Sequence, residues 1–261
     1  MTEEYTVDIE LLCGVLNEDG SIEKSCTIKA MTGGLRKKIS QPEYRKNGIK
    51  VIDAVLDACI ISIGKNPFVA SREKKRMLMA DSDFLMMKIR QLSLGNEVSM
   101  QLQCPSCDTK WNAELHIDEI ECFSIPEDNV EIIDGRRAFK IDTEHWKKCV
   151  MFYPNREDQA IIAKIAMNNP TQAAYSLYGR MLHLRDNKEV DDSEFMKEID
   201  KMPLMIIDEL TNEINGILPG VESTHEAECP GCSNTVEMEM GGADFLFKRP
   251  ETGNKKRLKI G

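Results

Sequence analysis

The sequence predicts an α+β fold, in which separate β-hairpins pack with helices. Three observations lead to this prediction. Apolar and polar residues alternate near the N-terminus and on both sides of two cysteine pairs, which is typical of strands with one buried face. Apolar residues recur at helical spacing in two segments of the first half and along most of 155–217. The length of 261 residues is also sufficient to bury a substantial core.

Turn-forming residues near the N-terminus predict a hairpin. Its three parts are a β-rich segment over 5–16 that alternates at first, the turn Asn17-Glu-Asp-Gly-Ser and a return strand over 26–30. Met31-Thr-Gly-Gly is then expected to be a loop.

Two helices are predicted to follow. Apolar residues fall on one stripe over 49–63, and Gly64 stands where a C-cap glycine is expected. A second apolar face runs over 82–94. Its capping candidates are Asp81 or Ser82 at the start and Gly95-Asn96 at the end.

The same strand–turn–strand unit occurs twice and carries two cysteines each time. Strands over 98–103 and 110–117 flank Cys104-Pro-Ser-Cys107, and the β pattern from 222 to 240 surrounds Cys229-Pro-Gly-Cys232. Each short Cys-x-x-Cys turn directs two sulfurs to one side, so two turns supply four thiolates. Four thiolates satisfy tetrahedral zinc at about 2.3 Å, and we therefore predict one structural Zn²⁺ held by Cys104, Cys107, Cys229 and Cys232.

Other interpretations of these cysteines are weaker but open. A redox Cys-x-x-Cys usually begins a helix, whereas both pairs here lie between strands, and unliganded thiols are the third interpretation. His116, Cys122 and His225 lie near the knuckles and could replace a ligand. The remaining cysteines are expected to be small buried apolar residues: Cys13, Cys26, Cys59 and Cys149.

An inserted helical region explains the wide separation of the two knuckles, which far exceeds the ~15–20 residues of a zinc ribbon. Closing the longer loop costs only roughly 1.7 kcal/mol more, against ~10–16 kcal/mol from a structural zinc. Helices are predicted over 158–168, 171–185, 193–200 and 204–217. The resulting organisation is 1–150 (hairpin, two helices and first knuckle), 151–220 (helical insertion), 221–247 (second knuckle) and 248–261 (basic tail).

Composition and motifs argue against several function classes. The 34 Lys+Arg and 44 Asp+Glu give a net charge of −10, which disfavours general nucleic-acid coating. No apolar run reaches the ~20 residues of a membrane helix, and no signal region begins the chain. We therefore expect an intracellular protein, or one that leaves a cell only as part of a larger assembly. No phosphate-binding, nucleophile-elbow or zinc-protease motif occurs. Glu144-His145-Trp146 could suggest an acid–base pair, but adjacent residues face different ways, so a surface or satisfied histidine is expected and no enzyme is predicted.

Several segments in a fixed order resemble the baseplate hub protein family of T-even-type contractile-tailed phages, which has relatives in phage-derived injection machines. These segments are Met31-Thr-Gly-Gly-Leu-Arg, Ala58-Cys-Ile-Ile-Ser-Ile-Gly, the stretch from Asp81 to Val98, Cys104-Pro-Ser-Cys107 and Asp244-Phe-Leu-Phe247. The resemblance covers roughly 5–120 and resumes at the second knuckle. The helical insertion is not matched.

The resemblance implies a non-enzymatic structural component or assembly factor of the central baseplate. It implies contacts with other baseplate and hub proteins, with tail-tube or tape-measure proteins as further candidates, and multiple copies set by tail symmetry. The protein would be made in the host cytoplasm and built into the virion tail. The alternatives are a zinc-ribbon nucleic-acid-binding or transcription accessory protein, whose basic tail would contact nucleic acid, and a thiol oxidoreductase.

Overall fold

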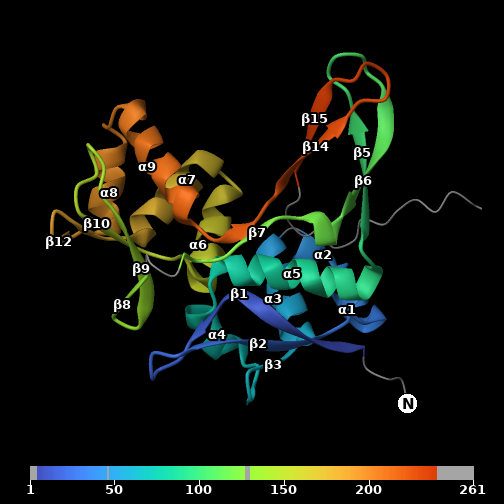
Figure 1. The fold of residues 1–261 in the computed structure, drawn as a ribbon, viewed down its shortest axis with the longest axis horizontal. Helices are drawn as coiled ribbons and strands as arrows, with labels where there is room; N and C mark the ends of the chain where they lie inside the picture. Colours follow the sequence, from blue (N-terminus) through green and yellow to red (C-terminus); the bar gives the residue numbers. More distant parts are fainter. Residues whose placement is uncertain (1–4, 46, 127–129, 240–261) are drawn as a thin grey trace, which may run out of the picture.

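The computed structural model describes residues 5–45, 47–126 and 130–239. Helices and small antiparallel sheets combine in this part of the chain, which confirms the predicted α+β class. Figure 1 shows an N-terminal body, a second helix-rich part beside it and a narrow arm that projects beyond α5. Among the described residues, no helix combines the length and apolar character needed to cross a bilayer. The basic tail, 248–261, lies outside the described residues.

The N-terminal body is built on a four-stranded sheet with the order β1-β2-β3-β4. Its elements are β1 (Thr6–Leu16), β2 (Ile22–Lys29), α1 (Gly33–Ile39), α2 (Pro42–Arg45), α3 (Gly48–Cys59), β3 (Ile60–Ile63), β4 (Asn66–Pro67), α4 (Ala70–Arg76) and α5 (Met79–Leu94). The predicted hairpin is confirmed as β1 and β2. Apolar side chains of the sheet, α3 and α5 share one core, in which Ile28, Val55, Leu85 and Ile89 are completely buried.

The helix predicted over 49–63 is wrong in its last turn. α3 ends at Cys59, and Ile60–Ile63 forms β3, which pairs with β2. Ile60, Ile61 and Ile63 are β-branched and suit a strand, and pairing with β2 satisfies the backbone groups that a longer helix would satisfy internally. Gly64 is therefore the turn after β3 and not a helix cap, with a φ of 57°.

Two predictions about helix starts are also wrong. Met31-Thr-Gly-Gly is not all loop, because α1 begins at Gly33 and the Thr32 hydroxyl accepts the N–H of Leu35 as its N-cap. α5 begins at Met79, three residues before the predicted start, and Leu78 is its N-cap without a side-chain hydrogen bond. Asp81 is instead completely buried, and its carboxylate accepts a hydrogen bond from the N–H of Cys13 at 2.9 Å. Gly95 does end α5, as predicted.

The second part combines a five-stranded sheet, in the order β12-β11-β10-β9-β8, with four helices. Its elements are β8 (Glu131–Ile133), β9 (Arg136–Ile141), β10 (Cys149–Phe152), α6 (Arg156–Ala166), α7 (Pro170–Met181), β11 (Leu182–Arg185), β12 (Lys188–Glu189), α8 (Asp192–Ile199) and α9 (Leu204–Ile217). Trp146, Met181, Leu210 and Ile214 lie in its core and are completely buried.

The predicted helices of this part are confirmed except in one place. The helix predicted over 171–185 ends at Met181, because Leu182–Arg185 pairs as β11 with β10. Residues 151–220 therefore contribute strands as well as helices, and the predicted boundary after residue 150 falls inside β10. The domain division itself stays a prediction.

A buried polar seam joins the two parts at an irregularity in β1. Arg137 of β9 donates hydrogen bonds to the carbonyls of Cys13 and Gly14, both at 2.6 Å, close to the point where Asp81 accepts the Cys13 N–H. The pairing of β1 with β2 shifts its register between Glu10 and Val15, so these backbone groups are left for side chains to satisfy.

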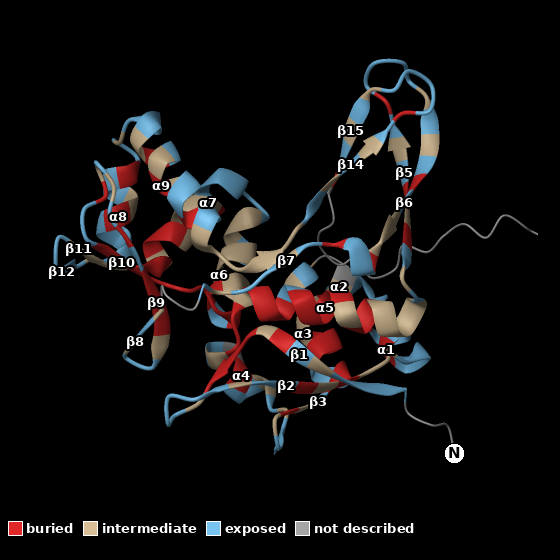
Figure 2. Ribbon diagram, in the orientation of Figure 1, coloured by how far each residue is buried: buried red, intermediate tan, exposed pale blue. Residues whose placement is uncertain are grey.

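The arm consists of two β-hairpins that lie side by side above α5 (Figure 1). Its elements and their connections are β5 (Glu97–Gln103), β6 (Lys110–His116), the 3₁₀ turn η1 (Ile117–Glu119), β7 (Cys122–Phe123), β13 (Gly220–Val221), β14 (Thr224–Glu228) and β15 (Thr235–Glu239). Arg90 of α5 donates to the carbonyls of Gly95 and Glu97 and so fixes where β5 leaves the helix. Figure 2 shows that the arm is mostly exposed or half-buried, whereas α5 beneath it is mostly buried.

Candidate metal centre

The two cysteine knuckles lie side by side at the tip of the arm and repeat the same backbone geometry. In the first, the N–H of Asp108 donates to the carbonyl of Cys104, and in the second the N–H of Ser233 donates to that of Cys229. Asp108 and Ser233 both adopt left-handed backbone, with φ of 58° and 57°. The repeat noted in the sequence is therefore also a repeat of turn conformation.

The knuckles bring the four predicted ligand atoms together. The Sγ atoms of Cys104, Cys107, Cys229 and Cys232 all lie within 4.8 Å of one another. The Cys104–Cys232 and Cys107–Cys229 sulfur pairs are each 3.6 Å apart. Four sulfurs at about 2.3 Å around a tetrahedral ion are separated by about 3.8 Å, so this arrangement fits such an ion.

Backbone N–H groups inside each turn point at the buried sulfurs. The N–H of Ser106 donates to Cys104 Sγ and that of Gly231 to Cys229 Sγ, both at 3.4 Å. Cys104 and Cys229 are buried, whereas Cys107 and Cys232 are exposed. Hydrogen bonds that favour charged sulfur are an expected feature of thiolates bound to a metal ion.

Hydrogen bonds in and between the knuckles shift the pKa values of Cys107 and Cys232 in opposite directions. A hydrogen bond with the hydroxyl of Thr109 is the main cause that lowers the pKa of Cys107 to about 6. At Cys232 the backbone N–H of Asn234 favours the thiolate, but the hydrogen bonds with Cys107 and Cys104 oppose it, and the pKa is raised to about 12. Adjacent thiolates repel one another, and a divalent cation between them would remove this conflict.

The other residues considered as ligands lie elsewhere. His116, Cys122 and His225 are not part of the cluster formed by the four sulfurs in the described chain. Cys122 Sγ instead lies 3.6 Å from the carbonyl oxygen of Ile120. His225 is in β14 and pairs with Met238, so it lies near the base of this hairpin and away from the knuckle at its tip.

One residue that the sequence did not indicate, Thr109, contacts a sulfur of the cluster. Its hydroxyl lies 3.2 Å from Cys107 Sγ, and a Cβ atom built on Gly231 would lie 2.5 Å from the same hydroxyl. Thr109 follows Cys107 by two residues, and this position after the knuckle is the only signal in the sequence that could have indicated it.

Comparison with known protein families gives one match. Residues 16–248 match the family described as T4 bacteriophage base plate protein. The chain belongs to this baseplate family. The match runs through the region between the knuckles, where the sequence resemblance identified nothing, and it does not specify a hub position. No curated protein and no solved structure gave a match.

The four remaining buried cysteines of this baseplate protein serve the core, as predicted. Cys13, Cys26, Cys59 and Cys149 are each at most 3% exposed. Burial raises the pKa of Cys13 and Cys26 to about 12 and that of Cys59 and Cys149 to about 11. These thiols are therefore neutral and packed as small apolar side chains.

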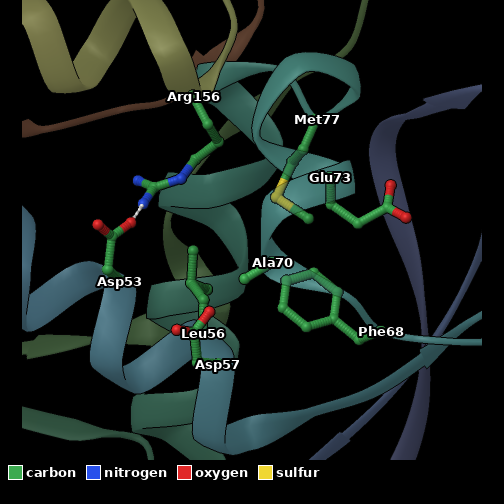
Figure 3. Close-up of a pocket in the computed structure, with 8 residues that line it drawn as sticks. All are labelled: Asp53, Leu56, Asp57, Phe68, Ala70, Glu73, Met77 and Arg156. Atoms are coloured by element: carbon green, nitrogen blue, oxygen red, sulfur yellow. Dashed lines mark hydrogen bonds and ion pairs between the residues drawn. The ribbon is translucent and has the colours of Figure 1, made fainter.

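Two cavities in the described chain lie away from the sulfur cluster. Figure 3 shows one between α3, α4 and α6, where Arg156 forms an ion pair with Asp53 across the opening and Glu73 and Met77 lie opposite. Its volume of about 10 Å³ accommodates a single water molecule. A larger cavity of about 190 Å³ lies between Leu78, Tyr153 and the chain leading into β13.

His145 has a hydrogen-bond partner other than Glu144, in agreement with the expectation of a satisfied histidine. His145 Nδ1 lies 2.6 Å from Glu209 Oε2 of α9, and the N–H of Glu144 donates to the same carboxylate. Trp146 beside them is completely buried, and its indole N–H donates to the carbonyl of Ile206. The contact therefore attaches the loop between β9 and β10 to α9.

Proposed function

We propose that this member of the baseplate family is a non-enzymatic structural component or assembly factor of the central, hub region of a contractile phage tail. The observation that carries the proposal is the family match over 16–248. The partners would be other baseplate and hub proteins, with tail-tube or tape-measure proteins as further candidates. The chain would be made in the host cytoplasm and placed in the tail in several symmetry-related copies.

The proposal assigns one Zn²⁺ to Cys104, Cys107, Cys229 and Cys232. The four-sulfur cluster supports this assignment, because an all-thiolate donor set at these separations suits zinc better than a hard cation such as Mg²⁺ or Ca²⁺. Four protein ligands fill a tetrahedral shell and leave no position for substrate. The ion would therefore hold the two hairpins of the arm together and do no chemistry.

Metal analysis of the purified full chain tests the zinc assignment. About one zinc ion per chain is expected, with loss of the ion in Cys229→Ser because three thiolates bind it more weakly. Cys122→Ser is the matched control and should keep the ion, since Cys122 lies outside the sulfur cluster. Parent protein without metal, in which all four thiols react freely with an alkylating reagent, would contradict the assignment.

Quantitative mass spectrometry of purified contractile tails from the source system tests the baseplate role. A copy number that fits the rotational symmetry of the tail identifies a built-in component. Absence from finished tails, with a tail-assembly defect on deletion, identifies an assembly factor. Absence without any defect would overturn the role and favour the nucleic-acid-binding alternative.

A further inference from the structure

A further cavity lies where the end of β1 meets α4 and β9, and its lining is strongly basic. The polar side chains that line it are those of Lys75, Arg76, Arg136, Arg137, Tyr153 and Asn155, and we call it the basic pocket. Its lining contains four cations and no carboxylate, although the chain as a whole has a net charge of −10.

The size of the basic pocket limits what it can hold. Its volume is about 30 Å³, and since ~10–15 Å³ is enough for one water molecule, it accommodates about two oxygen atoms. Lys75 and Gly135 in its lining are exposed, so the pocket can be reached from solvent.

Two of the four cations already have an acidic partner. Arg76 lies 3.4 Å from Glu73, and Arg136 lies 3.0 Å from Asp158. The bond to Asp158 uses one N–H of Arg136, whereas a guanidinium carries five, so Arg136 keeps donors for a further acceptor.

The other two cations form no ion pair in the part of the chain that the structure describes. Arg137 is only 4% exposed and donates to the neutral carbonyls of Cys13 and Gly14. The carboxylate of Asp81 favours its charged form, but Asp81 accepts the N–H of Cys13 and does not line the pocket. A buried cation without an ion pair is unfavourable, and an anion in the pocket would compensate its charge and that of Lys75.

A buried hydroxyl in the same lining also lacks a partner. Tyr153 is 1% exposed, and its hydroxyl has no hydrogen-bond partner among the described residues. Burial raises the pKa of Tyr153 to about 12, so this group is a neutral O–H at physiological pH and can donate. Because buried polar groups are nearly always hydrogen-bonded, the free hydroxyl indicates an occupant with an acceptor atom.

We propose that the basic pocket binds one carboxylate group, which accepts the Tyr153 hydroxyl and is held by the charges of Arg137, Lys75 and Arg136. A carboxylate has two oxygens and one negative charge, which match the volume and the cations without a carboxylate partner. Phosphate has four oxygens and exceeds this volume. An acidic side chain of a protein and a small free carboxylic acid present the same group.

Water is the competing occupant. Two water molecules fit the volume and could accept the Tyr153 hydroxyl, but they would leave the charge of buried Arg137 uncompensated. The carboxylate therefore satisfies both observations, and water satisfies only one.

A titration of the purified full chain with sodium acetate, followed by the NMR signals of the Gly135 and Arg136 amides, tests the proposal. Sodium chloride at the same ionic strength is the reference. Acetate should shift these signals saturably. Tyr153→Phe should weaken the binding of acetate about tenfold, because it removes a hydrogen bond to a charged group. Phenylalanine keeps the ring that packs 4.8 Å from Phe139, so the variant should fold.

Lys75→Gln should weaken acetate binding about threefold, since its cation is exposed and partly screened. Lys140→Gln is the matched control. It removes the same charge from a lysine of β9 that pairs with Glu131 outside the pocket, and acetate affinity should not change.

A second probe, the blocked peptide acetyl-Gly-Glu-Gly-amide, distinguishes the two sources of the carboxylate. Binding of this peptide at least as tight as that of acetate assigns the pocket to an acidic side chain of a protein. Binding of acetate alone assigns it to a small free carboxylic acid. Both results support the proposal, and neither depends on the baseplate role.

Four outcomes would overturn it. Acetate may produce no saturable shift in the parent, or chloride may produce the same shift. Tyr153→Phe and Lys75→Gln may both bind acetate as tightly as the parent. Inorganic phosphate, used as a third probe, may bind more tightly than acetate, which would contradict the match to a group with two oxygens.

Discussion

At the scale of single residues, the two knuckles differ in the space that is available for a side chain at the residue before the second cysteine. A Cβ atom at Gly231 would lie 2.5 Å from Thr109 Oγ1 and 3.4 Å from Cys107 Sγ. Ser106 occupies the equivalent place in the first knuckle, and its side chain is exposed to solvent. The second turn must therefore lack a side chain at this place, whereas the first tolerates one.

Gly231→Ala tests this asymmetry. The added methyl group would displace Thr109 from Cys107, and a loss of about 1–3 kcal/mol in unfolding free energy is expected, together with faster removal of the proposed zinc ion by a chelator. Denaturant unfolding and chelator competition measure the two effects. Ser106→Ala is the matched control and should change neither by more than about 0.5 kcal/mol. Equal effects of the two substitutions would argue against the steric explanation.

The cysteines show what could be predicted for individual residues. Spacing and repetition were enough to choose four cysteines out of nine and to leave Cys13, Cys26, Cys59 and Cys149 to the core. The contact of Thr109 with Gly231 joins the two knuckles across the space between them, and no local pattern encodes it. The same is true of Asp81, whose place in the sequence resembles a helix cap but whose partner is Cys13 of a distant strand.

At the scale of elements, the start of α6 depends on one buried carboxylate. Asp158 completes a capping box with Asn155, the N-cap of the helix. It also binds Arg136 at 3.0 Å and Arg180 at 2.8 Å, so β9 and α7 are attached to the same turn. Asp192 contacts Arg180 as well, but at 3.7 Å and with its side chain 53% exposed.

Asp158→Ala is expected to lower the unfolding free energy by about 2–3 kcal/mol. About 1 kcal/mol comes from the lost cap, and the rest from two arginines left without their buried partner, discounted because both are partly exposed. Asp192→Ala on the same arginine should lower it by less than about 1 kcal/mol. Urea unfolding at neutral pH compares the two variants, and similar losses would refute the dominant role of Asp158.

Among the features of the helices and strands, the ends of helices were predicted least well from the sequence. The segments at Ile60–Ile63 and Leu182–Arg185 continue an apolar helical stripe, yet each one forms a strand. In both cases a neighbouring strand, β2 or β10, offers backbone pairing that periodicity does not reveal. α9, in contrast, has the predicted bounds, because Pro203 and the residues after Ile217 limit it locally.

At the scale of the whole molecule, the arm is part of the fold as well as the place of the four-cysteine cluster. Phe84 and Met87 of α5 share an apolar cluster with Val98, Ala113 and Met238 from the two hairpins. The intervening part has its own core and returns the chain to the arm through β13, which pairs with β7. The second knuckle thus reaches the first because both hairpins rest on one helix, and an ion at the tip would secure contacts that already exist at the base.

The sequence by itself determined the α+β class, the N-terminal hairpin, the central helices and the four cysteines with their repeated turns. These features depend on local periodicity, turn chemistry and ligand spacing, which neighbouring residues encode. Only the tertiary structure decided where β3 and β11 replace helix and which partners Asp81 and Arg137 take. Those outcomes depend on groups far apart in the chain competing for the same backbone hydrogen bonds and the same buried space, and residues near each site do not record that competition.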